Sequence, residues 1–192
     1  MRTKYYLAYG SNINLPQMEV RCPDAIVAGT AILNDYELVF RGNNYRAVAN
    51  IEKKIGAYVP VVLWSISSSD EKALDRYEGW PTLYVKKILK VKMRGEIISA
   101  TAYVMNKGRC FGAPSSHYLE TIADGYDSFG FDMRPLYDAA ERDEARAGCK
   151  DANKIKRYRL YLEKEVFSDD VESYLKKLQD QGLEVKGFDE YI

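Results

Sequence analysis

Between residues 25 and 66 the chain alternates runs rich in β-branched and aromatic residues with short segments typical of turns. The runs cover 25–33, 36–41, 46–51 and 58–66, and they are separated by Asn34-Asp35, Gly42-Asn43-Asn44 and Lys53-Lys54-Ile55-Gly56. Runs this close together are joined as hairpins, because a parallel crossover needs a dozen or more residues. We therefore expect a mostly antiparallel sheet or a small barrel.

The remaining segments up to residue 131 add further strands and three helices. Strand patterns cover 5–9, 84–94 and 100–105. Helix starts are indicated at Asn14, which precedes a proline and a glutamine, at the capping box of residues 68–71, and near Ser115. Gly79 and Gly125 are the expected ends of the second and third helices. The expected class is α+β, a mixed and mostly antiparallel β-barrel-like sheet with flanking helices.

Beyond residue 131 the composition changes to a dense mixture of charged residues. Residues 132–147 fit a mostly solvated helix that ends at Gly148, and residues 171–178 have an apolar helical face. We expect a first domain over 1–131 and a charged C-terminal extension over 132–192, a small α/β appendage packed on the core.

The charge balance and the cysteines exclude several classes of protein. Lysine plus arginine equals aspartate plus glutamate, 28 each, so no net field draws the chain to nucleic acid or to an anionic membrane. The apolar run after Met1 is too short for a signal sequence or a membrane span. Cys22, Cys110 and Cys149 have no disulfide or zinc spacing. We expect a cytoplasmic protein without a metal or cofactor, and its oligomeric state, a homodimer included, stays open.

Two stretches combine into a candidate site. Tyr9-Gly10-Ser11-Asn12 lies between an expected strand and an expected helix, where backbone amides can seat a carboxylate or an oxyanion. Glu78 falls in the last turn of a short helix beside aromatic residues, so the helix dipole and partial burial would raise its pKa toward that of a general base. The plainer alternatives are an ordinary connection and a solvated glutamate.

Several motifs in register resemble the γ-glutamylcyclotransferase family, including its bacterial and AIG2-like members. The matching stretches are Tyr9 to Asn12, Arg21 to Asp24, Tyr36 to Arg41, Leu74 to Gly79, Tyr84-Val85, and Pro114-Ser115 with Tyr118. They occur in family order over roughly residues 4 to 130. Two details depart from the family pattern: Ile13 replaces a leucine or methionine, and the separation between Glu78 and Tyr84 is short.

The resemblance implies roles for individual residues. Tyr9 and the main-chain donors of Gly10, Ser11, Asn12 and Ile13 would bind a γ-glutamyl head group. Glu78 would be the catalytic acid and base, and Tyr84 and Tyr118 would line the pocket or donate hydrogen bonds in it.

The implied reaction is cyclisation of a small γ-glutamyl substrate to 5-oxoproline, with release of an amine or amino acid. Three alternatives share these motifs: a γ-glutamylamine cyclotransferase, a pathway-specific deprotecting enzyme, and a non-catalytic member that binds a metabolite or a partner protein through residues 132–192.

Overall fold

The computed structural model describes residues 4–147, which belong to one compact unit. The helix expected over 171–178 and the rest of the C-terminal appendage lie outside the described residues and stay predictions. None of the helices within residues 4–147 is long and apolar enough to cross a membrane.

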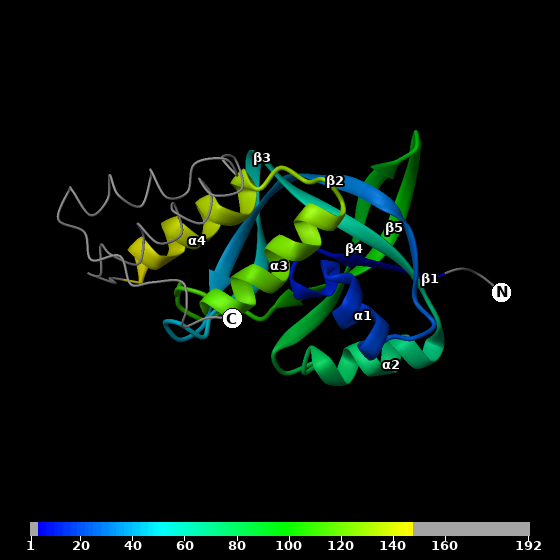
Figure 1. Ribbon diagram of the computed structural model, residues 1–192, viewed down its shortest axis with the longest axis horizontal. Helices are drawn as coiled ribbons and strands as arrows, with labels where there is room; N and C mark the ends of the chain where they lie inside the picture. Colours follow the sequence, from blue (N-terminus) through cyan, green and yellow to red (C-terminus); the bar gives the residue numbers. More distant parts are fainter. Residues whose placement is uncertain (1–3, 148–192) are drawn as a thin grey trace, which may run out of the picture. The chain divides into compact units, whose positions relative to one another are not determined.

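Five strands close into a barrel in the order β1-β3-β2-β4-β5 (Figure 1). Their bounds are β1 (Lys4–Ala8), β2 (Ile26–Arg41), β3 (Val48–Ile66), β4 (Tyr84–Met93) and β5 (Glu96–Met105). All neighbours are antiparallel except β1 and β5, which pair in parallel. The expected mixed, mostly antiparallel barrel with flanking helices is confirmed.

The four expected runs between residues 25 and 66 are in fact two long strands. The predicted turns at Asn34-Asp35 and at residues 53–56 are wrong: β2 and β3 continue through both segments. The two segments lie opposite each other and form a bulge, at which Asn34 pairs with Tyr58 but Tyr36 pairs with Lys53. Asp35 has a φ of 60°, and its carboxylate accepts a hydrogen bond from the amide of Gly56. The residues typical of turns therefore form a β-bulge, which shifts the pairing register within one hairpin and does not end either strand.

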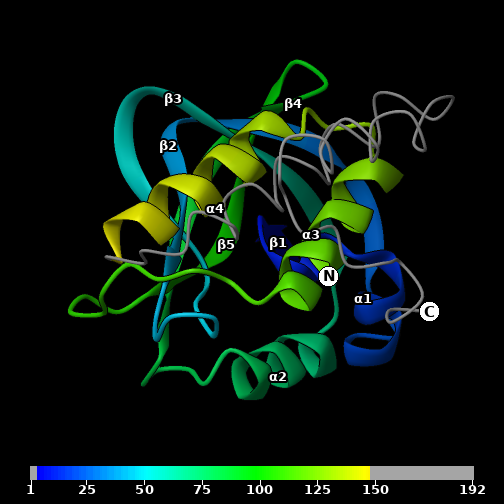
Figure 2. The same ribbon diagram turned by 60° about the vertical axis from the view of Figure 1, so that its left-hand side comes forward.

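Helices cover the outside of the barrel, and three of them begin at side-chain caps. They are a short 3-10 helix η1 (Ser11–Ile13), α1 (Leu15–Arg21), α2 (Ser68–Tyr77), α3 (Ser116–Ser128) and α4 (Arg134–Arg146). Asn14 caps α1 and Ser115 caps α3, as expected. The capping box of α2 is formed by Ser67 and Asp70, one residue earlier than the predicted box of residues 68–71. Figure 2 shows α2 beside α1 on the side of the barrel away from α4.

Gly125 does not end α3, as the sequence predicted, because the helix continues to Ser128. A Cβ at Gly125 would lie 2.8 Å from Cγ2 of Ile13 and 2.9 Å from the amide of Asn14. The glycine therefore allows α3 to approach η1 closely. In this way α3 supports the turn that follows β1.

Helix α4 exists as expected, but the prediction that it is mostly solvated is wrong. Leu136, Ala139 and Ala140 are fully buried, and the helix packs against β2. Asp143 is also fully buried, and its carboxylate accepts a hydrogen bond of 2.7 Å from the backbone amide of Phe40 in β2. The many charged residues of this segment make its apolar face difficult to recognise from the sequence.

Candidate active site

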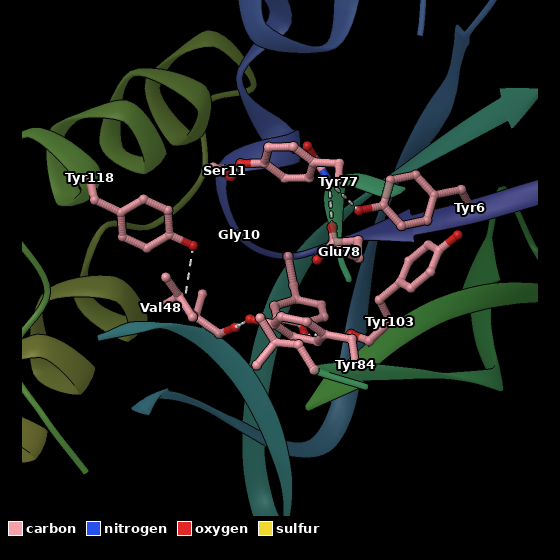
Figure 3. Close-up of a pocket in the computed structure, with 13 residues that line it drawn as sticks. Tyr6, Gly10, Ser11, Val48, Tyr77, Glu78, Tyr84, Tyr103 and Tyr118 are labelled. Atoms are coloured by element: carbon pink, nitrogen blue, oxygen red, sulfur yellow. Dashed lines mark hydrogen bonds between the residues drawn. The ribbon is translucent and has the colours of Figure 1, made fainter. Parts of the chain in front are cut away.

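A cavity of about 230 Å³ lies where β1, α2, β4 and α3 meet (Figure 3). Its wall is rich in tyrosine and comes from segments far apart in the sequence. The lining residues are Tyr6, Tyr9, Gly10, Ser11, Asn12, Val48, Ala49, Tyr77, Glu78, Leu83, Tyr84, Tyr103 and Tyr118. Among residues 4–147 there is no cluster of three or more side chains that could hold a metal ion.

The turn after β1 brings backbone donors to this cavity. Gly10 packs so closely on β3 that a Cβ would lie 3.0 Å from Cβ of Ala49. The carbonyl of Asn12 accepts a hydrogen bond of 3.1 Å from the indole of Trp64, which fixes the turn to the barrel. The amides of Ser11 and Asn12 open a helical turn and so have no acceptor within it. No hydrogen bond within the described residues uses them, or the amide of Gly10, as donors.

Glu78 comes directly after α2, at its C-cap, and reaches the same cavity. Its Oε1 accepts a hydrogen bond of 2.8 Å from Nδ2 of Asn12, and Oε2 accepts none within the described residues. Burial raises the pKa of Glu78 to about 7, against the opposing effects of the Arg21 charge and the Asn12 hydrogen bond. The carboxyl group therefore changes its protonation near neutral pH.

Two tyrosines of the cavity wall, Tyr84 and Tyr118, form hydrogen bonds with the same residue of β3. The hydroxyl of Tyr84 donates to the carbonyl of Ala49 at 2.8 Å, and the hydroxyl of Tyr118 accepts from the amide of Ala49 at 3.2 Å. Burial raises the pKa of Tyr118 to about 12 and that of Tyr84 well above its ordinary value. Both hydroxyls therefore stay protonated at any physiological pH. In Figure 3 the Tyr118 hydroxyl points toward the centre of the cavity.

Seven of the eight predicted site residues line the cavity. Tyr9 does so while its hydroxyl donates to the carbonyl of Tyr103. Ile13 does not: its side chain is fully buried, and its amide donates to the carbonyl of Gly10 at 2.9 Å. The structure thus places Ile13 behind the turn, between it and α3.

The polar side chains at or beside the cavity that sequence reasoning did not assign to the site are those of Tyr6, Arg21, Tyr77 and Tyr103. Arg21 gave two signals, since it lies four residues after Gln17 on α1 and within a motif shared with the family. Tyr77 gave one signal, since it precedes Glu78 within the matching stretch Leu74 to Gly79. Tyr6 and Tyr103 gave none, because the chain has 16 tyrosines and only the closed barrel decides which of them meet.

A family model described as "Gamma-glutamyl cyclotransferase, AIG2-like" matches residues 6–126. This range contains the complete cavity lining, from Tyr6 to Tyr118. The chain belongs to this family. The resemblance found in the sequence motifs is thereby confirmed.

Individual relatives agree with this membership of the gamma-glutamyl cyclotransferase family. A protein named gamma-glutamylcyclotransferase from Mus musculus is 32% identical over 133 residues, which are 64% of this chain and 70% of the relative. The protein of that name from Homo sapiens is 30% identical over 140 residues, 67% of this chain and 72% of the relative. A solved structure titled "Gamma-glutamyl cyclotransferase" has a TM-score of 0.63 at 26% identity, and the match covers 72% of this chain and 86% of that one.

Proposed function

We propose that this protein is a γ-glutamylcyclotransferase-type enzyme. The α-amine of a γ-glutamyl amide or peptide attacks its own γ-carbonyl, and the products are 5-oxoproline and a free amine or amino acid. The observation that carries the proposal is Glu78, a carboxylate with a pKa of about 7. Within residues 4–147, one of its oxygens accepts no hydrogen bond, and the same cavity is lined by backbone amides that donate none. Family membership supports the same reaction class.

The substrate supplies its own nucleophile, so the protein mainly has to orient it and assist proton transfer from the attacking to the departing nitrogen. Intramolecular attack in a well-oriented geometry can lower the barrier by up to about 7–11 kcal/mol. The α-amine has a pKa of about 8 and is mostly protonated at neutral pH. Glu78 takes a proton from this ammonium group, and the neutral amine forms the new C–N bond that closes the ring. Glu78 delivers that proton to the departing nitrogen as the old C–N bond breaks, and the second proton that the ring nitrogen loses goes to the released amine, which leaves as an ammonium ion.

Backbone amides complete the proposed site. The amides of Gly10, Ser11 and Asn12 would bind the substrate α-carboxylate or stabilise the tetrahedral oxyanion, since preorganised donors are most effective where charge develops. Tyr84 and Tyr118, which stay protonated, would close the side wall.

The first experiment measures 5-oxoproline by mass spectrometry after incubation with a panel of γ-glutamyl dipeptides and γ-glutamyl amines. We expect release by the wild type and a rate at least ~100-fold lower for Glu78→Gln, the usual scale for loss of a general base. Glu19→Gln is the matched control, because Glu19 is exposed on α1 and outside the cavity.

Each outcome separates the alternatives. Preference for the amines would favour a γ-glutamylamine cyclotransferase or a deprotecting enzyme. Full activity of Glu78→Gln would remove the proposed base. Absence of 5-oxoproline with every substrate would shift support to a non-catalytic binding protein.

A further inference from the structure

Arg21, the last residue of α1, is held beside the cavity by three contacts. Its Nη1 donates to Oδ1 of Asn12 at 2.6 Å, and its Nη2 donates to the side-chain oxygen of Gln17. Its guanidinium also lies over the ring of Tyr77, 3.8 Å from the centroid. Together these three contacts hold the Arg21 side chain in one position.

These contacts determine the orientation of the Asn12 amide. A guanidinium can only donate hydrogen bonds, so the Asn12 atom that faces it must be the oxygen. The NH₂ group therefore faces the other way, where it donates to Oε1 of Glu78 and to the hydroxyl oxygen of Tyr6, each at 2.8 Å. Because Tyr6 accepts this bond, its own hydroxyl proton remains available, and no hydrogen bond within the described residues uses it.

We infer that Arg21 is a positioning residue of this site: it orients the Asn12 amide so that Glu78 receives a hydrogen-bond donor and Tyr6 keeps its proton for a bound substrate. The inference rests on the proposed function for its catalytic meaning. It goes beyond that function because Arg21 acts through Asn12 and does not line the cavity.

The charge of Arg21 influences the pKa of Glu78 because the tyrosines that line the cavity with Glu78 are uncharged. Six tyrosines line the cavity that the carboxyl group reaches: Tyr6, Tyr9, Tyr77, Tyr84, Tyr103 and Tyr118. Tyrosine hydroxyls are uncharged near neutral pH. Of the charged side chains in residues 4–147, Arg21 is the one that acts on the pKa of Glu78, and it lowers that pKa against the effect of burial.

The direct test is a titration of the Glu78 carboxyl carbon by ¹³C NMR, with Glu78→Gln to assign the signal. In Arg21→Met we expect the pKa of Glu78 to rise by about one unit, since an opposite charge nearby typically lowers a carboxyl pKa by one unit or more. Gln17→Ala is the matched control: it removes a neighbouring anchor of Arg21 but leaves the contact with Asn12, and we expect no shift. An unchanged pKa in Arg21→Met would overturn the inference.

A second readout is the pH profile of kcat/KM for 5-oxoproline release. The acid limb of Arg21→Met should move to higher pH by the same interval as the NMR titration, which a loss of fold stability alone would not produce. Arg21→Lys should show a smaller shift and partial recovery of the rate, because it keeps the charge but not the forked contact geometry. A wild-type profile in Arg21→Lys would overturn the orienting role, even if Arg21→Met fails to fold.

The two proposals can fail separately. If Glu78→Gln remains fully active, or no substrate releases 5-oxoproline, the proposed function fails, whereas the NMR titration still decides whether Arg21 controls the protonation of Glu78.

Discussion

Glu78 at the cavity and Asp143 in α4 are both carboxylates withdrawn from solvent, but their surroundings differ. Asp143 is fully buried and meets Nε of Arg142 at 3.0 Å and Nη1 of Arg146 at 3.3 Å. It also accepts the backbone amide of Phe40 at 2.7 Å. Each oxygen of Asp143 therefore has donors, and two of its partners are cations.

Glu78 has a single side-chain donor, the uncharged amide of Asn12, and its second oxygen is unused within the described residues. Arg21 contacts that amide and not Glu78 itself, and its charge lowers the pKa of Glu78 without a hydrogen bond between the two within the described residues. The comparison teaches that burial alone does not mark a functional carboxylate. Asp143 has donors for both oxygens and joins α4 to β2, whereas Glu78 has one donor and can exchange a proton near neutral pH.

The largest expected effect on stability comes from replacing Asp143, the carboxylate with a structural role. Asp143→Ala leaves the buried amide of Phe40 without its acceptor and removes the partner of two arginines. Breaking a buried ion pair from one side costs about 3–5 kcal/mol. Urea unfolding should show a loss of at least about 3 kcal/mol, while the folded fraction keeps its activity per molecule.

The control for that variant lies on the same helix. Asp138 is exposed on α4, so Asp138→Ala should change the free energy of unfolding by less than about 0.5 kcal/mol. Equal effects of Asp143→Ala and Asp138→Ala would show that the buried pairing contributes nothing, and the contrast with Glu78 would lose its basis.

An intermediate effect is expected for Glu78, and the pH dependence of the free energy of unfolding tests it. The pKa of Glu78 rises on folding from 4.5 to about 7, so the folded state is favoured while the group is protonated, and this advantage is lost as the pH rises through 7. Glutamine is neutral at every pH. Glu78→Gln should therefore match the wild type at low pH and exceed its unfolding free energy above pH 7, by up to about 3 kcal/mol and by less where water reaches the carboxyl group.

Urea unfolding across this pH range measures that difference, with Glu19→Gln as the exposed control. A difference between Glu78→Gln and wild type that stays constant with pH would mean that the carboxyl group titrates normally. The proposed base would then need another source of activation.

Local features of the chain were predictable because their causes are local. The caps at Asn14 and Ser115 depend on side chains that reach amides three residues away, and both were read correctly from the sequence. The position of Glu78 at the end of α2 follows from the capping box before the helix and Gly79 after it. The family motifs then indicated which residues meet.

Features that depend on distant partners could not be predicted. The bulge at Asp35 looks like a turn until the opposite segment is known to pair on both sides of it. Gly125 looks like a helix end until Ile13 is found against it. The charges of α4 conceal a buried face, because Asp143 is compensated by arginines of its own helix and by an amide of β2. Arg21 acts through Asn12, a contact that no sequence spacing specifies.

The smallest expected effect concerns a third carboxylate, Asp132, which is paired but not deeply buried. Hydrogen bonds from Arg134 lower the pKa of Asp132 to about 2, yet the Arg134 side chain is 80% exposed. Stability from this pair is present above pH 3.8 and is lost as the pH falls through about 2. Because solvent screens the pair, Asp132→Asn should cost less than about 1 kcal/mol at neutral pH, and this cost should shrink in high salt. Urea unfolding measures this cost. A loss as large as that of Asp143→Ala would show that pairing alone, without burial, determines how much a carboxylate contributes to the free energy of unfolding.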